Sequence, residues 1–292
     1  MRRKTKGLVI GACGASSYGT NPLFALPLFA AEISVNSVLF YRYSVALVLF
    51  FLWQTFVKKH SLKISKKQAL FLFPLGIIFA VSSLTLFMSY TYIDAGIAST
   101  ILFIYPVLVA VIMAAFFGEK ISKRTVIAII LTSVGISLFY KGGNGQPLNL
   151  KGVALVLISA LSYAVYMVAI KKVPAIKHCN YSTVTFYVML FGLIVFWANL
   201  KFGVNLQALN SWFVFGCAVA LAIFPTILSL ETMTIAIKMI GPTPAAVLGA
   251  LEPLTAVFFG VLVFHEQMTL KIACGIALIL SAVLIIVLEK KK

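Results

Sequence analysis

Three ionisable side chains interrupt otherwise apolar stretches of this sequence: Arg42, Glu231 and Glu252. A charge at bilayer depth is costly, so each such residue is by default a candidate functional group. A carboxylate can bind a substrate amine or carry a coupling proton, and a guanidinium can hold a substrate carboxylate through paired hydrogen bonds. These three residues are therefore our first candidates for a substrate site.

Each of the three also has a structural interpretation. Glu252 precedes Pro253, whose missing N–H leaves a carbonyl one turn back unpaired, and a protonated Glu252 can hydrogen-bond to that backbone. Glu231 can form an ion pair between helices with Arg42 or Lys238. Arg42 itself can serve in helix packing or in a gate. The sequence leaves both sets of interpretations open.

Amphipathic side chains in the same apolar stretches extend the candidate substrate site. They combine an apolar body with a hydroxyl or amide that can orient a ligand. One pair, Asn21-Pro22, also interrupts the first apolar run and predicts a broken helix there. The candidates are Tyr18, Asn21, Tyr90, Tyr105, Tyr163 and Tyr166.

The elements that must position these residues are transmembrane helices. Hydrophobic residues make up 62% of the 292 residues, charged residues only 11%, and the mean hydropathy is +1.06. A soluble domain would need charged helix faces that are missing here. Because nearly all of its apolar runs reach the roughly 17 to 25 residues that a span needs, we predict an all-α integral membrane protein with ten transmembrane helices. The runs cover residues 7–28, 37–57, 69–92, 95–117, 125–140, 152–170, 183–200, 212–237, 245–264 and 272–288.

Lysine and arginine are unequally distributed between alternate loops. One side receives 19 of the 24 basic residues, including those at both chain ends, the other receives four, and Arg42 lies within a span. Such an excess marks the cytoplasmic side. We expect a multi-pass protein of the cell (inner) membrane with both termini in the cytoplasm. The apolar segment near the amino end is too short for a signal peptide and is predicted to start the first span.

One pattern occurs twice along the chain: a residue followed by proline, an apolar run, and a glutamate thirteen residues after the proline. The copies, 105–119 and 252–266, are offset by 147 residues, close to half the chain. We therefore predict two repeats, 1–145 and 146–292, joined by the turn-rich segment 141–151. An odd number of spans in each half places the second copy upside down relative to the first, as in alternating-access carriers.

Other functional classes lack the residues that they need. Asp94 is the only aspartate and the three histidines fall in loops, so the constellations of intramembrane enzymes are missing. The four cysteines have no CxxC spacing, and the sequence contains no P-loop for ATP. Despite a net charge of +17, the basic residues lie between apolar runs, which argues against nucleic acid as a partner. We expect no catalytic residue, no metal and no cofactor.

In the order and spacing of its motifs the chain resembles the drug/metabolite transporter superfamily, and within it the EamA type with ten helices in two five-helix repeats. The similarity covers nearly the whole chain, although the second repeat has Val188 where the first has Arg42. The residues that carry it are Phe40-Tyr41-Arg42-Tyr43, Ile97-Ala98-Ser99 through Pro106, Gly118-Glu119-Lys120-Ile121-Ser122, Leu251-Glu252-Pro253 and His265-Glu266-Gln267-Met268-Thr269.

The resemblance implies a secondary active transporter that moves a small metabolite, such as an amino acid, by alternating access, with export favoured over import. The alternatives are an importer or exchanger of a nucleotide-like or cationic metabolite, a channel or scaffold subunit and, least supported, a membrane enzyme. The expected partners are the small-molecule substrate, the lipid bilayer and protons as a coupling ion, in a monomer or homodimer. Glu231 and Glu252 are the candidates for the titrating groups.

Overall fold

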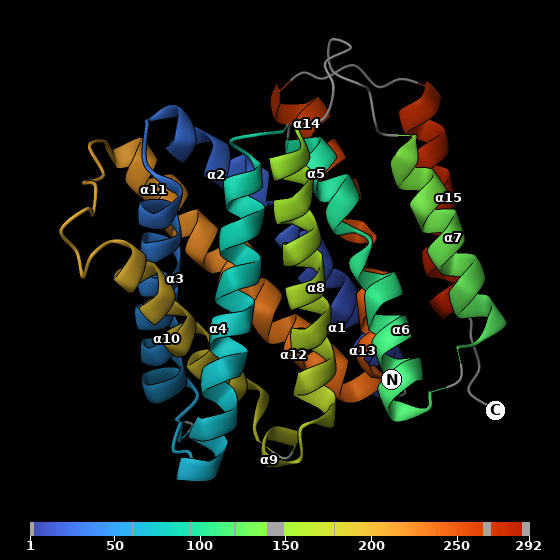
Figure 1. Ribbon diagram of the computed structural model, residues 1–292, viewed down its shortest axis with the longest axis horizontal. Coiled ribbons are helices and arrows are strands. Elements are labelled where there is room, and N and C mark those ends of the chain that lie inside the picture. The colour runs from blue at the N-terminus through green and yellow to red at the C-terminus, as the bar shows by residue number, and fades with distance from the viewer. Residues whose placement is uncertain are drawn as a thin grey trace.

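The computed structural model describes residues 3–59, 61–93, 95–119, 121–138, 149–177, 179–264 and 270–287, and none of these residues lies in a β-strand (Figure 1). The expected boundary between the halves, after residue 145, lies outside the described residues. The helices are α1 (Arg3–Tyr18), α2 (Asn21–Ala30), α3 (Val35–Leu52), α4 (Lys66–Ser89), α5 (Ala95–Leu102), α6 (Tyr105–Phe117), α7 (Lys123–Ser137), α8 (Leu150–Lys172), α9 (Pro174–Lys177), α10 (Tyr181–Asn199), α11 (Trp212–Ala222), α12 (Ser229–Ile240), α13 (Pro242–Leu248), α14 (Leu251–Phe264) and α15 (Leu270–Val287), with π-helical segments η1 (Trp53–Val57) and η3 (Ile223–Leu228).

The described helices confirm an all-α protein with many apolar spans. Five helical stretches are long and apolar enough to cross a membrane unaided: Val35–Val57, Lys66–Ser89, Leu150–Lys172, Tyr181–Asn199 and Trp212–Ile240. The remaining predicted spans correspond to α7, to α15 and to the three helix pairs α1–α2, α5–α6 and α13–α14.

Several of these helices begin at a polar residue that caps their free N–H groups. The Ser65 hydroxyl accepts from the N–H of Gln68 while the Gln68 side chain accepts from the N–H of Ser65, which forms a capping box at the start of α4. Asn149 and Asn180 cap α8 and α10 in a similar way. Local sequence therefore fixes where these spans enter the apolar layer.

Three predicted spans are broken in their middle. The first run breaks at Gly19 and Thr20, as the Asn21-Pro22 pair predicts. The runs 95–117 and 245–264, which we predicted as single helices, are also interrupted, the latter at Gly249. In each case a proline follows within the first three residues of the second helix, where its missing N–H costs no hydrogen bond.

A π-helical segment interrupts a fourth span without breaking it. Segment η3 joins α11 to α12 and contains Pro225, which has no N–H to continue the α-helical ladder. A π segment shifts the hydrogen-bond register and leaves local carbonyls available to other groups. The run 212–237 gave no indication of this irregularity in its residue pattern.

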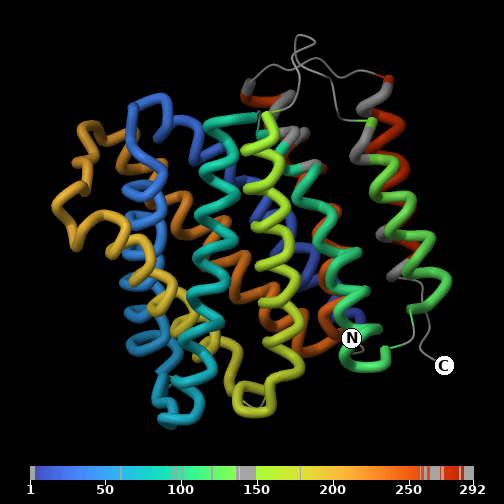
Figure 2. Tube along the Cα trace, viewed as in Figure 1, coloured from blue at the N-terminus to red at the C-terminus, as the bar shows by residue number. Residues whose placement is uncertain are grey.

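The two halves run in opposite directions through the molecule. In Figure 1, α1 rises from the N-terminal end toward α2 at the top, whereas α8 descends to α9 at the bottom. The helix contacts show a matching pattern: α1 of the first half packs on α12 of the second, and α8 of the second half packs on α4 of the first. Helices α7 and α15, the last of each half, lie side by side at one edge (Figure 2). The start of α1 and the end of α15 lie toward the bottom, the end that carries α9.

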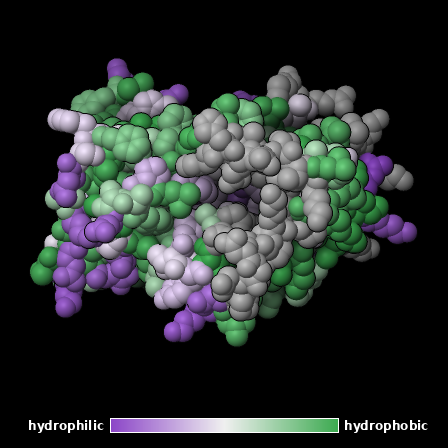
Figure 3. All heavy atoms as spheres, turned by 90° about the horizontal axis from the view of Figure 1, so that it is seen from above, coloured by the Kyte–Doolittle hydropathy of each residue, from purple (hydrophilic) through white to green (hydrophobic). Residues whose placement is uncertain are grey.

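The surface of the helix bundle suits a lipid environment. Large apolar side chains such as Leu70, Phe116 and Phe258 are exposed. Hydrophobic atoms cover much of the described surface when the molecule is viewed from the end that carries α2 and α5 (Figure 3). Large exposed apolar areas are unfavourable in water but cost nothing against hydrocarbon.

Close packing between α7 and α15 depends on Gly135, which has no side chain. A Cβ on Gly135 would lie 2.8 Å from the Gly275 carbonyl and 2.9 Å from the Ile279 side chain. We expect Gly135→Leu to lower stability by about 1–3 kcal/mol through overpacking. Thermal unfolding in detergent measures this effect, with Ser133→Leu on the exposed face of α7 as the control. Equal melting temperatures for the two variants would contradict the close contact.

Candidate functional site

The two prolines of the repeated pattern bring a buried carboxyl and a buried phenol together. Tyr105 begins α6 and Glu252 lies in the first turn of α14. The Tyr105 hydroxyl donates to Oε1 of Glu252 at 3.3 Å, and both side chains are buried. These residues occupy equivalent positions of the repeated pattern, 147 residues apart, so their contact joins the two halves of the chain.

Glycines at two of the helix breaks make this contact possible. A Cβ on Gly249 would overlap the Tyr105 hydroxyl, so only glycine leaves room for the phenol at this break. A Cβ on Gly19 would overlap the backbone carbonyl of Glu252, which shows how closely the first break approaches α14. The breaks therefore bring the Tyr105 hydroxyl against the carboxyl group of Glu252 and Gly19 against its backbone.

A narrow cavity lies beside this carboxyl group. Its volume is about 20 Å³, which holds little more than one water molecule. The polar groups that reach it come from both halves of the chain. Its lining comprises Tyr18, Gly19, Asn21, Pro22, Leu86, Tyr90, Ser99, Leu102, Glu252, Pro253 and Ala256.

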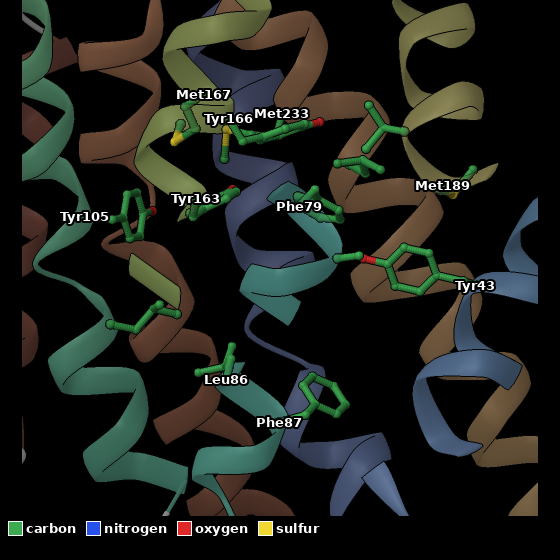
Figure 4. Packing of buried hydrophobic residues seen from close by; sticks show 14 of the residues in the cluster. Tyr43, Phe79, Leu86, Phe87, Tyr105, Tyr163, Tyr166, Met167, Met189 and Met233 are labelled. Carbon is green, nitrogen blue, oxygen red and sulfur yellow. The ribbon is translucent and has the colours of Figure 1, made fainter. Parts of the chain in front are cut away.

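Aromatic rings close the space next to the cavity. The Tyr163 ring contacts the rings of Tyr105 at 4.9 Å, Tyr166 at 6.1 Å and Tyr18 at 6.2 Å between centroids. Figure 4 shows Tyr105 on α6 and Tyr163 and Tyr166 on α8, with Phe79 of α4 beside them. Tyr18 belongs to the first half and Tyr163 to the second, so this stacked pair of rings is another contact between the two halves.

Arg42 lies behind the wall of the cavity and does not line it. Its side chain is fully buried, and its Nε donates to the Thr226 hydroxyl at 2.5 Å. Its Nη2 donates to the Pro225 carbonyl at 3.1 Å, an acceptor that belongs to the π-helical segment η3. The guanidinium carbon is 5.9 Å from the centroid of the Tyr18 ring, which separates Arg42 from the cavity.

Glu231 lies apart from these residues, near the start of α10. Its Oε1 accepts a hydrogen bond from the Ser182 hydroxyl at 2.5 Å, and Glu231 is not among the residues that line the cavity. Lys238 donates to the carbonyls of Ile176 and Cys179, which join α9 to α10. No hydrogen bond among those found for Arg42 reaches Glu231.

The structure thus brings most of the predicted site residues to one place. Tyr18, Asn21, Tyr90 and Glu252 line the cavity. Tyr105 and Tyr163 pack directly behind it, Tyr166 follows one turn along α8, and Arg42 lies beyond Tyr18.

Residue spacing did not indicate two kinds of participant. Gly19 and Gly249 carry no functional group, and their importance becomes visible only from the close contacts at the breaks. Thr226 and Pro225 hold Arg42 from 184 and 183 residues further along the chain, which no local pattern indicates. Of the two repeated glutamates, Glu119 is exposed after α6, and Glu266 lies outside the described residues.

Known proteins resemble this chain over nearly its full length. An uncharacterized transporter of Archaeoglobus fulgidus is 26% identical over 266 residues, which cover 90% of this chain and 91% of that protein. The uncharacterized transporter YcbK of Bacillus subtilis is 23% identical over 290 residues, or 94% of this chain and 91% of that protein. A crystal structure at 15% identity superposes with a TM-score of 0.82 over 97% of this chain and 98% of the other, which shows a shared fold.

The halves of the chain also match one family separately. The EamA-like transporter family matches residues 5–141 and again residues 150–288. The two matches together span nearly all of the chain, in agreement with the opposed halves of the structure. The chain is therefore a multi-pass membrane transporter that belongs to the EamA-like transporter family of the drug/metabolite transporter superfamily.

Proposed function

We propose that this protein is a secondary active transporter that exports a small metabolite, an amino acid or a related compound, across the cytoplasmic membrane by alternating access. The observation that carries the proposal is the buried Glu252 carboxyl at the meeting point of three broken spans, hydrogen-bonded to its counterpart Tyr105. In carriers with inverted repeats, substrates and coupling ions bind on discontinuous helices at the interface between the repeats.

The chemistry of Glu252 supports exchange of a substrate amine for a proton. A carboxylate binds an ammonium group more strongly than a phenol, because charge-assisted hydrogen bonds are about twice as strong as neutral ones. When the carboxyl takes up a proton, its attraction for the ammonium is lost. A site that holds either the amine or the proton exchanges one for the other, and an inward proton gradient then drives the substrate outward.

The arrangement of the cavity supports alternating access to this site. The cavity lies between the breaks and the end that carries α2, α5 and α14, while Phe79, Tyr163 and Tyr166 fill the space toward the opposite end. A metabolite does not fit in about 20 Å³, so the halves must move apart to admit it. The interruptions beside Gly19 and Gly249 are natural hinges, because few backbone hydrogen bonds oppose bending there.

The basic end of the molecule is proposed to face the cytoplasm. The start of α1, the end of α15 and the basic segments around α9 lie at this end, opposite α2 and α5 (Figure 1). Near this end, the hydrogen bond between Ser182 and Glu231 ties α10 to α12, and the two from Lys238 tie α12 to α9 and to the residues that join α9 to α10. We propose that these contacts help to close the cytoplasmic half, with Glu231 as a second candidate for a titrating group.

The coupling role of Glu252 is testable in liposomes that contain the purified protein. Glu252→Gln keeps the shape of the side chain but cannot carry a negative charge. We expect it to reduce proton-driven flux at least about tenfold, since a lost charge-assisted hydrogen bond costs about 1.5–3 kcal/mol. Its remaining exchange of substrate for substrate should no longer depend on pH. The exposed Glu119→Gln is the matched control, with flux as in the wild type.

Glu231→Gln completes this series of variants. If Glu252→Gln and Glu231→Gln both left the flux and its pH dependence unchanged, neither carboxyl would couple transport to protons. Loss of pH dependence only in Glu231→Gln would assign proton coupling to Glu231, among the contacts that close the cytoplasmic half, instead of to Glu252.

The fit of Tyr105 against Gly249 gives a second test. Gly249→Ala places a methyl group where the Tyr105 hydroxyl lies, and Tyr105→Phe removes that hydroxyl. Each change should weaken substrate binding, but the double variant should lose less than the sum of the two, by about 0.5–3 kcal/mol of coupling. Competition binding to the wild type, the two single variants and the double variant measures this coupling energy. Gly216→Ala, which adds a methyl group in open space, controls for the substitution. Strict additivity would show that the two residues act separately.

A cationic metabolite is the second candidate substrate. Glu252 and the tyrosine rings of the cavity can bind a cation through charge and through aromatic faces, without any carboxylate on the ligand. A competition screen of amino acids, nucleosides and organic cations against the purified protein separates these classes. Saturable flux of organic cations alone would replace the amino-acid proposal with this one.

A further inference from the structure

Arg42 is a buried cation without a carboxylate partner in the described part of the chain. Its side chain has 0% exposure. Its hydrogen bonds to η3 go to a hydroxyl and a carbonyl, the Tyr18 hydroxyl is a further polar neighbour, and no described carboxylate lies within ion-pair distance of it. A permanently charged guanidinium in an apolar interior is costly unless an anion balances it. The structure therefore contains a positive charge whose balancing anion is missing from its described surroundings.

One edge of the guanidinium is also unused. Nε and Nη2 are held by Thr226 and Pro225, whereas the buried Nη1 has no hydrogen-bond partner. Burying a polar group without a partner is unfavourable, and such groups are rare in folded proteins. The two bonds to η3 fix the orientation of the side chain and leave Nη1 free to donate. This is the arrangement of a preformed donor site rather than of a completed structural contact.

The surroundings of Arg42 connect it to the cavity. The guanidinium carbon lies 5.3 Å from the Phe87 ring centroid and 5.9 Å from that of Tyr18. Tyr18 lines the cavity, and so does Leu86, the neighbour of Phe87. One tyrosine side chain therefore separates the cation from the space beside Glu252. Displacement of the Tyr18 ring would join Arg42 to that space.

We propose that Arg42 is the carboxylate subsite of the transport site, so that the carrier takes zwitterionic α-amino acids, with the carboxylate at Arg42 and the ammonium at Glu252. The inference rests on the carrier function proposed above and narrows its substrate class. Guanidinium groups bind carboxylates with two donors in a fixed fork, which gives both strength and orientation. A zwitterionic ligand supplies a carboxylate to pair with the Arg42 guanidinium and an ammonium group to pair with the Glu252 carboxylate.

The ligand requirement is tested with matched pairs that differ only in the carboxylate. Leucine, phenylalanine, threonine and lysine are compared with their amides as competitors and as substrates of the purified protein in liposomes. We expect at least one free amino acid to bind at least tenfold more tightly than its amide. Amides that bind as well as their acids, or a protein that binds none of the four acids, would overturn the inference.

The residue requirement is tested with Arg42→Gln and Arg42→Lys. Arg42→Gln should weaken binding of the acid at least tenfold and leave the amide within about twofold, so that the preference disappears. Arg42→Lys keeps the charge without the fork and should restore part of the preference. Size-exclusion profiles and thermal unfolding establish that the variants fold, and the exposed Lys63→Gln is the control for loss of a positive charge. Equal weakening of acid and amide by Arg42→Gln would show a purely structural role.

Failure of this inference is distinguishable from failure of the carrier function. Saturable flux of a cation without a carboxylate, unchanged in Arg42→Gln, would retain a carrier and reject the carboxylate subsite. Absence of saturable flux for amino acids, amides, nucleosides and organic cations would reject both.

Discussion

The contact between Tyr105 and Glu252 is the interaction on which the rest of the structure depends. A carboxyl group in the apolar interior needs a donor, and a phenol from the opposite half supplies it. For the two groups to meet, α6 and α14 must each start in the middle of the bundle, and Gly249 must lack a side chain. The broken spans, the glycine positions and the crossing of the two halves are consequences of placing this polar pair at depth.

The same constraint explains how irregular backbone is distributed in the molecule. Backbone groups that face hydrocarbon must be satisfied within their own helix, so breaks are tolerated only inside the bundle. The three breaks and the π-helical segment η3 occur where polar side chains gather, at Glu252 and at Arg42. Helices α4 and α10 are continuous and capped by serine or asparagine. Apart from the π-helical segment η1 at the end of α3, these irregular segments therefore lie beside Glu252 and Arg42.

Sequence alone was sufficient for the membrane class, the all-α architecture and the family, because composition, span length and motif spacing are local properties. It also pointed to Glu252 and to a break at Asn21-Pro22. It did not predict that the runs containing Tyr105 and Glu252 are broken, since proline is compatible with both a kinked and an interrupted helix. The acceptors of Arg42 and the separate position of Glu231 depend on packing between helices far apart in the chain, which residue spacing does not encode.

The equivalence of Tyr105 and Glu252 has a consequence for how such a protein can arise. In a dimer of two identical half-length chains, the residue before the proline would face its own copy across the symmetry axis. Two glutamates there would repel each other or share a single proton, and two tyrosines would provide no charge. Once the two copies differ in sequence, as the two halves of this chain do, one copy can become the donor and the other the acceptor. Divergence of the two halves is therefore what permits a single, unshared acidic group at this contact.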